Sequence, residues 1–354
     1  MFMFKTLVAF FIIFASLVNA LPTPHQRLRR SCPNKTSSGN SNDAAAAPKS
    51  TTKSSSPSKS SAKPESKSNS TTLSTGTKLL SAVFPIGVKT GSEGWTTVQG
   101  AQAALPLSDA TLRPTKDLTA LPHPYVSAPD GTKAMEATYA KGSWTFGSSG
   151  GSKKGGFSFY APGPAHVDLT LAKEATFGYS VMFADNFEWN LGGKMPSHFQ
   201  STYGGDSAEV ATSCSGGRRA NDCWSARFMW RQKAPPSYSA NKKICNIKPL
   251  SECNPTYGAS VARGSYNFKV GGWNQISQRV KLNDPGQENG EIQVWSNGES
   301  VINLSGLVLR DSDKGRIWGA QMQTFFGGHT EEYASPTNTK AWFADFSMAI
   351  TQNL

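Results

Sequence analysis

The hydrophobic and polar positions between Cys223 and Arg231 alternate with the two-residue period of a β-strand. One face of this strand is apolar and consists of Ala226, Phe228 and Trp230. The other face carries a hydroxyl and two guanidinium groups and consists of Ser225, Arg227, Met229 and Arg231. Such a row suits a ligand with repeated carboxylates, because a guanidinium binds a carboxylate through two hydrogen bonds. The alternative is a solvated strand face with exposed arginines.

Patterns of the same kind recur from residue 79 to the end of the chain. They predict strands at Thr176–Phe183, Cys223–Gln232, Tyr266–Val270, Trp273–Leu282, Glu291–Ser296, Glu299–Leu304, Ile317–Phe326 and Trp342–Thr351. Asn297-Gly298 lies between two alternating runs and predicts a tight hairpin. The sequence contains no long amphipathic helix and no internal repeat. We therefore expect residues 79–354 to form one all-β domain, a two-sheet sandwich of the jelly-roll type.

The first 20 residues have the layout of a secretory signal peptide. Lys5 precedes an apolar run, and small residues before Ala20 suit cleavage after that position. The apolar run from Leu7 to Val18 is shorter than the roughly 20 residues that a membrane span needs. No later stretch is long and apolar enough to anchor the chain. We therefore expect a secreted protein with no membrane span.

Residues 21–78 are rich in Ser, Thr, Lys and Pro and poor in apolar residues, so they predict a disordered tail. This tail has ten basic and two acidic residues, a net +8 of the chain's +12. The folded part is only mildly basic, which argues against a nucleic-acid partner. A basic tail suits an acidic wall or capsule polysaccharide, or it is a spacer. Arg29-Arg30 fits either a processing site or two solvated arginines.

Four of the five cysteines lie within one short stretch. Of the three possible pairings, we expect Cys214–Cys223 and Cys245–Cys253, because each bridge would hold a loop beside a strand. A zinc site is disfavoured, because the stretch lacks a C-x-x-C pair and a secreted protein meets an oxidising compartment. Cys32 is left over, as a free thiol or an intermolecular link. The sequence contains no cofactor motif.

Several segments, in this order, resemble the catalytic domain of polysaccharide lyase family 14. They are GGKMP (192–196), YGG (203–205), CSGG (214–217), CWSARFMWR (223–231), CNPTYGASVARGSYNF (253–268), NGEIQVWSNGESVI (289–302) and FFGGH (325–329). The resemblance covers residues 175–354. It implies a jelly roll that holds an acidic polysaccharide such as alginate or glucuronan. It also implies cleavage of that polysaccharide by β-elimination.

The resemblance also implies catalytic roles. Lys194 matches the essential lysine of the family, and Ser225 and Arg227 match its active-sheet serine and arginine. The family has a Tyr-x-Tyr pair about a dozen residues later, where this chain has only Tyr238. The segment from Lys194 to YGG also carries extra residues. We expect Lys194, Ser225, Arg227 and Tyr238 to be catalytic, with Tyr or Lys as base and acid.

Other polar residues are candidates for substrate binding or modification. Gln321 and Gln323 alternate with Met322 before FFGG, so they share one strand face. Their amides suit the binding of sugar hydroxyls or of a carboxylate. The alternative is a polar outward strand face. Arg231, His329 and His198 are further candidates, although loop histidines often have no such role. Three sequons predict glycosylation at Asn34, Asn69 and Asn303, the last only if its side chain faces solvent.

A glycoside hydrolase would need two carboxylates facing one cleft. Glu291 is the nearest strand carboxylate, and it has no acidic partner two or four residues away. The remaining alternative to a lyase is a carbohydrate-binding or wall-associated protein that keeps the basic groove without cutting. The sequence leaves the uronate polymer, the endo or exo mode of cutting and the oligomeric state open.

Overall fold

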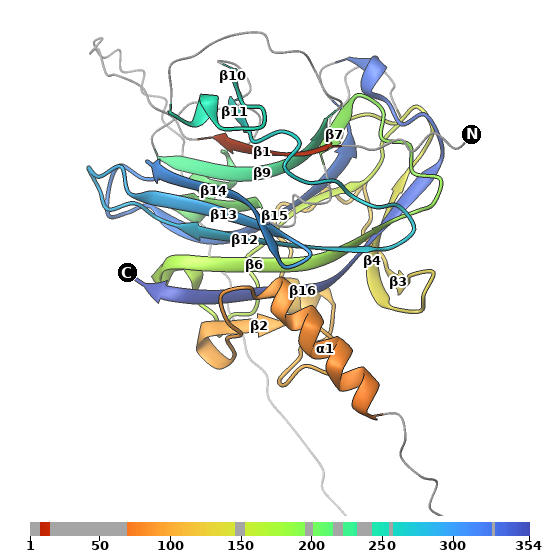
Figure 1. Ribbon diagram of the computed structural model, residues 1–354, viewed down its shortest axis with the longest axis horizontal. Helices are drawn as coiled ribbons and strands as arrows, with labels where there is room; N and C mark the ends of the chain where they lie inside the picture. The colour runs from red at the N-terminus through yellow and green to blue at the C-terminus, as the bar shows by residue number, and fades with distance from the viewer. Residues whose placement is uncertain are drawn as a thin grey trace, which may run out of the picture. The chain divides into compact units, whose positions relative to one another are not determined.

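The computed structural model describes residues 8–14, 69–145, 153–194, 201–214, 222–231, 243–254, 258–327 and 330–354. Within these ranges the chain forms two antiparallel β-sheets that pack face to face, with helix α1 on the outer side of one of them (Figure 1). Helices are few and, apart from α1, short: α1 (Asn69–Val83), α2 (Asp109–Leu112) and α3 (Ala208–Thr212). The predicted all-β sandwich is confirmed.

The sheet that carries the predicted functional strand is called sheet A. Its strands follow the order β10 (Glu252–Asn254), β11 (Gly258–Val261), β1 (Val8–Phe14), β9 (Cys223–Arg231), β7 (Gly192–Lys194), β15 (Arg316–Phe326) and β5 (Phe157–Ala161). Strand β8 (Ser201–Gly205) pairs with both β15 and β9. Strand β9 therefore lies in the middle of the sheet, with other strands paired along both of its edges.

The opposing sheet B contains the longest strands. Their order is β14 (Glu299–Leu307), β13 (Gly290–Ser296), β12 (Trp273–Lys281), β6 (Ala172–Phe183), β16 (Thr339–Asn353), β4 (Lys133–Tyr139) and β3 (Tyr125–Ser127), and β2 (Gly94–Thr96) pairs with β16. The predicted hairpin at Asn297-Gly298 joins β13 to β14, and both residues have positive φ angles (53° and 85°). This conformation is that of a type I′ turn, which suits the twist of the two strands.

The core between the sheets is one cluster of buried apolar side chains. Sheet A contributes residues such as Phe159, Trp230 and Phe326, and sheet B contributes residues such as Tyr179 and Phe343. A hydrogen bond also crosses the core, because the Thr202 hydroxyl donates to Gln278 Oε1 at 3.0 Å. Interdigitated aromatic rings of this kind fix the distance between the sheets.

Two segments differ from the expectations. Tyr266–Val270 is not a strand, so this prediction is wrong: Val270 makes only an isolated bridge, to Phe183. Tyr266 and Phe268 pack into the core from irregular backbone, and their burial produced the alternating pattern. Helix α1 begins at Asn69, inside the expected tail, because its later residues pack on sheet B through Val83 and Ala349.

Strand β1 comes from the predicted signal peptide. Val8–Phe14 pairs with β9 on one side and with β11 on the other. Apolar, aromatic and β-branched residues suit a strand as well as they suit the apolar run of a signal peptide. A chain that has lost residues 1–20 would lose this neighbour of β9 and β11.

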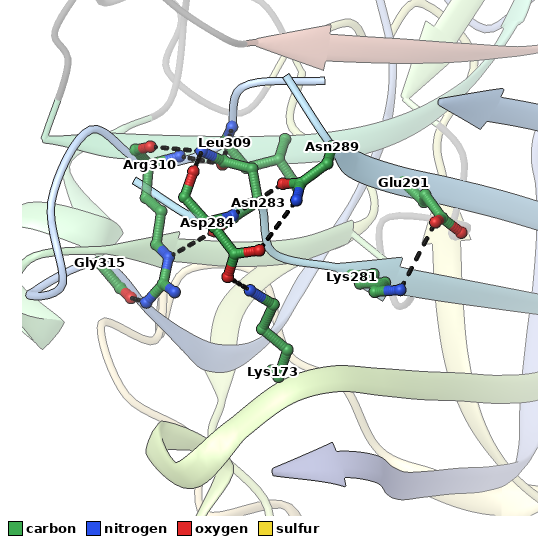
Figure 2. A network of polar contacts seen from close by, with 9 residues as sticks. All are labelled: Lys173, Lys281, Asn283, Asp284, Asn289, Glu291, Leu309, Arg310 and Gly315. Carbon is green, nitrogen blue, oxygen red and sulfur yellow. Dashed lines mark hydrogen bonds and ion pairs between the residues drawn. The ribbon is translucent and has the colours of Figure 1, made fainter. Parts of the chain in front are cut away.

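A buried polar cluster fixes the start of β15. Asn283 is fully buried, and its Oδ1 accepts hydrogen bonds from the backbone N–H groups of Leu309 (2.7 Å) and Arg310 (2.9 Å). Arg310 in turn donates to the carbonyls of Asn283 (2.8 Å) and Gly315 (3.2 Å) (Figure 2). These bonds attach the segment before β15 to the end of β12, so they set the position from which β15 crosses sheet A.

Replacing Asn283 by Ala should lower the free energy of unfolding by about 3 kcal/mol, because it leaves two buried backbone N–H groups without acceptors. Asn289→Ala is the control, because Asn289 bonds to Asp284 in the same cluster but is exposed (Figure 2). It should cost less than about 1 kcal/mol. Equal losses in chemical denaturation would contradict the proposed importance of the buried amide.

Candidate functional site

Strand β9 separates its side chains in the predicted way. Trp224, Ala226 and Trp230 belong to the core between the sheets. Ser225 and Arg227 lie on the opposite face. The side chains of Phe228, Met229 and Arg231 are outside the described part of the structure, so the alternation is confirmed for the other six of the nine positions, Cys223–Arg227 and Trp230.

The indole rings of β9 explain two glycine motifs. A Cβ atom on Gly193 would lie 2.2 Å from the ring of Trp230, and one on Gly204 would lie 2.3 Å from the indole nitrogen of Trp224. Only glycine leaves room for these rings. The indole N–H of Trp230 also donates to the carbonyl of Trp189 at 2.5 Å. The glycines in GGK and YGG are therefore packing residues that let β7 and β8 lie against the tryptophans.

The face of sheet A that carries Arg227, on the side away from the core, is called the Arg227 face. Seven polar and aromatic residues on this face, from four strands, surround Arg227 or lie beside it in the sheet: Ser158, Tyr160, Tyr203, Ser225, Arg227 itself, Gln321 and Gln323. Gln321 Nε2 donates to the Tyr160 hydroxyl (3.1 Å), and Gln323 Nε2 donates to the Ser158 hydroxyl (3.0 Å). The structure thus brings the two predicted glutamines into the same sheet face as Arg227.

Sequence reasoning missed two tyrosines on this face. The rings of Tyr160 and Tyr203 meet edge to face, with centroids 4.8 Å apart. Burial, together with the neighbouring Tyr160, raises the pKa of Tyr203, so its hydroxyl stays protonated at neutral pH. The alternation in FSFYA, which buries Phe157 and Phe159 in the core, is the signal that could have placed Tyr160 on the opposite face.

Arg227 donates hydrogen bonds to Ser225 and to Cys214. Its Nε donates to the Ser225 hydroxyl (3.0 Å), and its Nη2 donates to the carbonyl of Cys214 (3.2 Å). The Ser225 hydroxyl donates to the same Cys214 carbonyl (3.3 Å). Burial lowers the pKa of Arg227 to about 10, and a favourable interaction with Tyr160 opposes this effect. The guanidinium therefore remains charged at neutral pH although it is only 2% exposed.

The end of helix α3 covers part of this face. The Tyr160 hydroxyl donates to the carbonyl of Thr212 at 2.7 Å, and Ala211 packs against Tyr160 and Tyr203. Ser225, Arg227, Gln321 and Gln323 are at most 4% exposed. The interpretations of a solvated Arg227 and of an outward polar glutamine face are therefore wrong, because Arg227, Gln321 and Gln323 are buried.

The remaining predicted site residues fall into two groups. The backbone of Lys194 pairs with Phe325 of β15 and Met229 of β9, and that of Arg231 pairs with Gly192. Lys194 thus occupies a register position between the strands that carry Gln323 and Arg227, but the side chains of Lys194 and Arg231 are not described. Tyr238, His198 and His329 lie outside the described residues.

The expected disulfides are confirmed. Cys214 bonds to Cys223, and Cys245 bonds to Cys253. Asn303 is exposed in β14, as the predicted glycosylation requires, and so is Ser305 of the same sequon. Asn69 is the first residue of α1, whereas Asn34 and Cys32 lie outside the described residues.

Across the described residues, no group of His, Cys, Asp and Glu side chains has the arrangement of a metal site. None of the helices in that part of the chain has the length and apolar character needed to cross a membrane.

Comparisons with known proteins identify the family. A family model described as polysaccharide lyase 14 matches residues 127–346. The chain therefore belongs to this family and is a polysaccharide lyase. The resemblance stated from the sequence motifs is thus confirmed, and the match begins at residue 127, earlier than the expected start at residue 175.

Solved structures show a related fold. A marine alginate lyase of the same family from Aplysia kurodai is 24% identical, with a TM-score of 0.59, and the match covers 74% of this chain and all of the other. An alginate lyase from Chlorella virus is 27% identical with a TM-score of 0.47, over 65% of this chain and 89% of the other. No curated protein sequence matches this chain.

The glycine packing gives a testable consequence. Gly193→Ala should lower the free energy of unfolding by about 1 to 3 kcal/mol, because the new methyl group overlaps the buried Trp230 ring. Gly272→Ala is the control, since nothing lies within 4 Å of a Cβ atom at Gly272, and its effect should stay within about 0.5 kcal/mol. Thermal and chemical denaturation measure both. A Gly193→Ala variant as stable as the control would contradict the packing argument.

Proposed function

We propose that this protein cleaves a uronate polysaccharide by β-elimination, with alginate and polyglucuronate as the first substrates to test. The observation that carries the proposal is the buried, charged Arg227, held on one face of the fold of a polysaccharide lyase family. The Aplysia relative is named an alginate lyase, which makes alginate the first choice. Polyglucuronate is included because the family resemblance implies an acidic polysaccharide such as alginate or glucuronan.

The chemistry requires three kinds of group. A base removes the proton from C5 of the uronate, the electron pair forms the C4–C5 double bond, and the bond from C4 to the bridging oxygen breaks. An acid gives that oxygen a proton. Negative charge grows on the carboxylate meanwhile, and a guanidinium stabilises it. We assign this last role to Arg227, and by family resemblance we assign proton transfer to Lys194 and Tyr238.

The buried position of Arg227 supports this assignment. An ion pair between a guanidinium and a carboxylate is stronger where water is excluded than at an exposed surface. The glutamines of β15 lie on the same face and supply amide groups for the sugar ring. Arg231 and His329 remain candidates for binding other sugar units of the polysaccharide.

The purified protein, incubated with alginate or polyglucuronate, should produce unsaturated uronate ends, which ultraviolet absorbance detects. Arg227→Ala and Lys194→Ala should each lower kcat/KM by at least about 100-fold, because each removes a group that acts in the transition state. Binding of either polymer without new absorbance would favour a carbohydrate-binding protein. Activity that survives both substitutions would mean that the site is wrong.

We also propose that the protein is secreted and glycosylated, possibilities that its signal-like first 20 residues, its two disulfides and its sequons support. A host with a secretory pathway should export a chain that begins at Leu21. An acidic wall or capsule polysaccharide is the partner that suits the basic residues 21–78.

Peptide mass mapping of the exported protein should find a glycan on Asn303, because both Asn303 and Ser305 are exposed. Treatment with a glycan-removing amidase should lower the mass, and Asn303→Gln should abolish that part of the change. The same peptide digest shows whether Asn34 and Asn69 carry glycans. An exported chain that still contains Val8–Phe14 and carries no sugar would contradict both proposals.

A further inference from the structure

Ser225 has no proton left for a substrate in the observed arrangement. A serine hydroxyl has one proton to donate, and that of Ser225 points to the carbonyl of Cys214 at 3.3 Å. The same oxygen accepts the Nε proton of Arg227 at 3.0 Å. The hydrogen bonds of Ser225 are therefore directed to the protein itself, and specifically to Arg227 and to the group that binds Arg227.

The Cys214 carbonyl is the second element that holds the guanidinium. It accepts from Nη2 of Arg227 at 3.2 Å, so Nε and Nη2, on one edge of the planar group, have fixed acceptors. Together with Ser225 these bonds form a closed ring of three residues. Two hydrogen bonds along one edge fix both the plane of the guanidinium group and the direction in which its opposite edge points. A single hydrogen bond would not fix both.

A covalent bond fixes this carbonyl relative to the strand. Cys214 is bonded to Cys223, which lies two residues before Ser225 on the same strand β9. The backbone N–H of Cys214 also donates to the carbonyl of Ala211 (3.2 Å), at the end of helix α3. The acceptor and the arginine are therefore held to one strand by a closed covalent loop.

We propose that Ser225 and the disulfide Cys214–Cys223 are positioning elements for Arg227, and that Ser225 acts on the reaction only through the guanidinium that it orients. The inference rests on the proposed function, in which Arg227 stabilises the substrate carboxylate. It changes the role expected for Ser225, from a residue that contacts the substrate to one that fixes the direction of a cation.

The first test separates orientation from folding. Ser225→Ala should lower kcat by about 100-fold and change KM by less than about threefold, because a misaligned guanidinium loses its effect mainly in the transition state. Ser277→Ala is the matched control: Ser277 is also fully buried and donates to main-chain carbonyls, but it lies in sheet B. It should lower stability to a similar degree and leave kcat unchanged. Equal kcat values in the two variants would overturn the proposal.

The second test uses chemical rescue. Guanidinium added to Arg227→Ala should restore part of the activity by occupying the place between Ser225 and the Cys214 carbonyl. In the Arg227→Ala/Ser225→Ala variant, the concentration for half of the maximal rescue should rise about tenfold, because one hydrogen bond to the cation is lost. An unchanged concentration would show that Ser225 does not hold the cation.

The two disulfides provide a third comparison. They close loops of similar length, with sequence separations of 9 and 8 residues. Removing either pair by double Cys→Ala substitution should therefore lower the Tm by a similar amount. Only Cys214→Ala/Cys223→Ala should lower kcat, by about tenfold or more, because only this bridge holds the acceptor of Arg227. Equal loss of activity in both variants would contradict the positioning role of the disulfide.

A measurement without substrate separates this inference from the proposed function. In the unmodified protein, NMR should show slow solvent exchange of the Arg227 Nε proton, since it is buried and hydrogen-bonded. Ser225→Ala should accelerate this exchange at least about tenfold, and Ser277→Ala should not. If the unmodified protein cuts neither polymer, the proposed function is wrong. The exchange rates then decide by themselves whether Ser225 positions Arg227, and equal rates in the two variants would overturn that claim.

Discussion

The packing of two indole rings against two glycines is the constraint on which the rest of the site depends. Trp224 and Trp230 point from β9 into the core, and Gly204 and Gly193 on the neighbouring strands leave room for them. Because side chains alternate along a strand, burying the tryptophans on one face commits Ser225 and Arg227 to the other. A shift of one residue would bury the guanidinium among aromatic rings, so the core determines where the charge lies.

That charge is then buried on its own side of the sheet, and the protein compensates for its desolvation. A buried guanidinium is stable only if its N–H groups find acceptors. The Ser225 hydroxyl and the Cys214 carbonyl provide two, and the lowered pKa of Arg227 still leaves it charged at neutral pH. The result is a cation with a fixed direction in a site that excludes water.

Local patterns predicted the parts of the structure that depend on neighbouring residues. The alternation in β9, the hairpin at Asn297-Gly298 and both short-range disulfides follow from residues close in sequence. Contacts between distant segments were not accessible in this way. Nothing near Tyr160 in the sequence indicates that β5 lies beside β15, or that the Thr212 carbonyl accepts a hydrogen bond from the Tyr160 hydroxyl. For the same reason the burial of Arg227 under the Cys214 segment could not be foreseen.

The tyrosines show how such distant contacts change the chemical argument. With only Tyr238 at the position of the family's tyrosine pair, the sequence alone indicated a shortage of tyrosines at the site. The structure places two more on the Arg227 face, but their hydroxyls differ in availability. The Tyr160 hydroxyl donates a hydrogen bond to the Thr212 carbonyl and accepts one from Gln321, so its role is to connect these segments. Burial raises the pKa of Tyr203, so it keeps its proton and is not a base at neutral pH. The base that removes the C5 proton must therefore come from another part of the site.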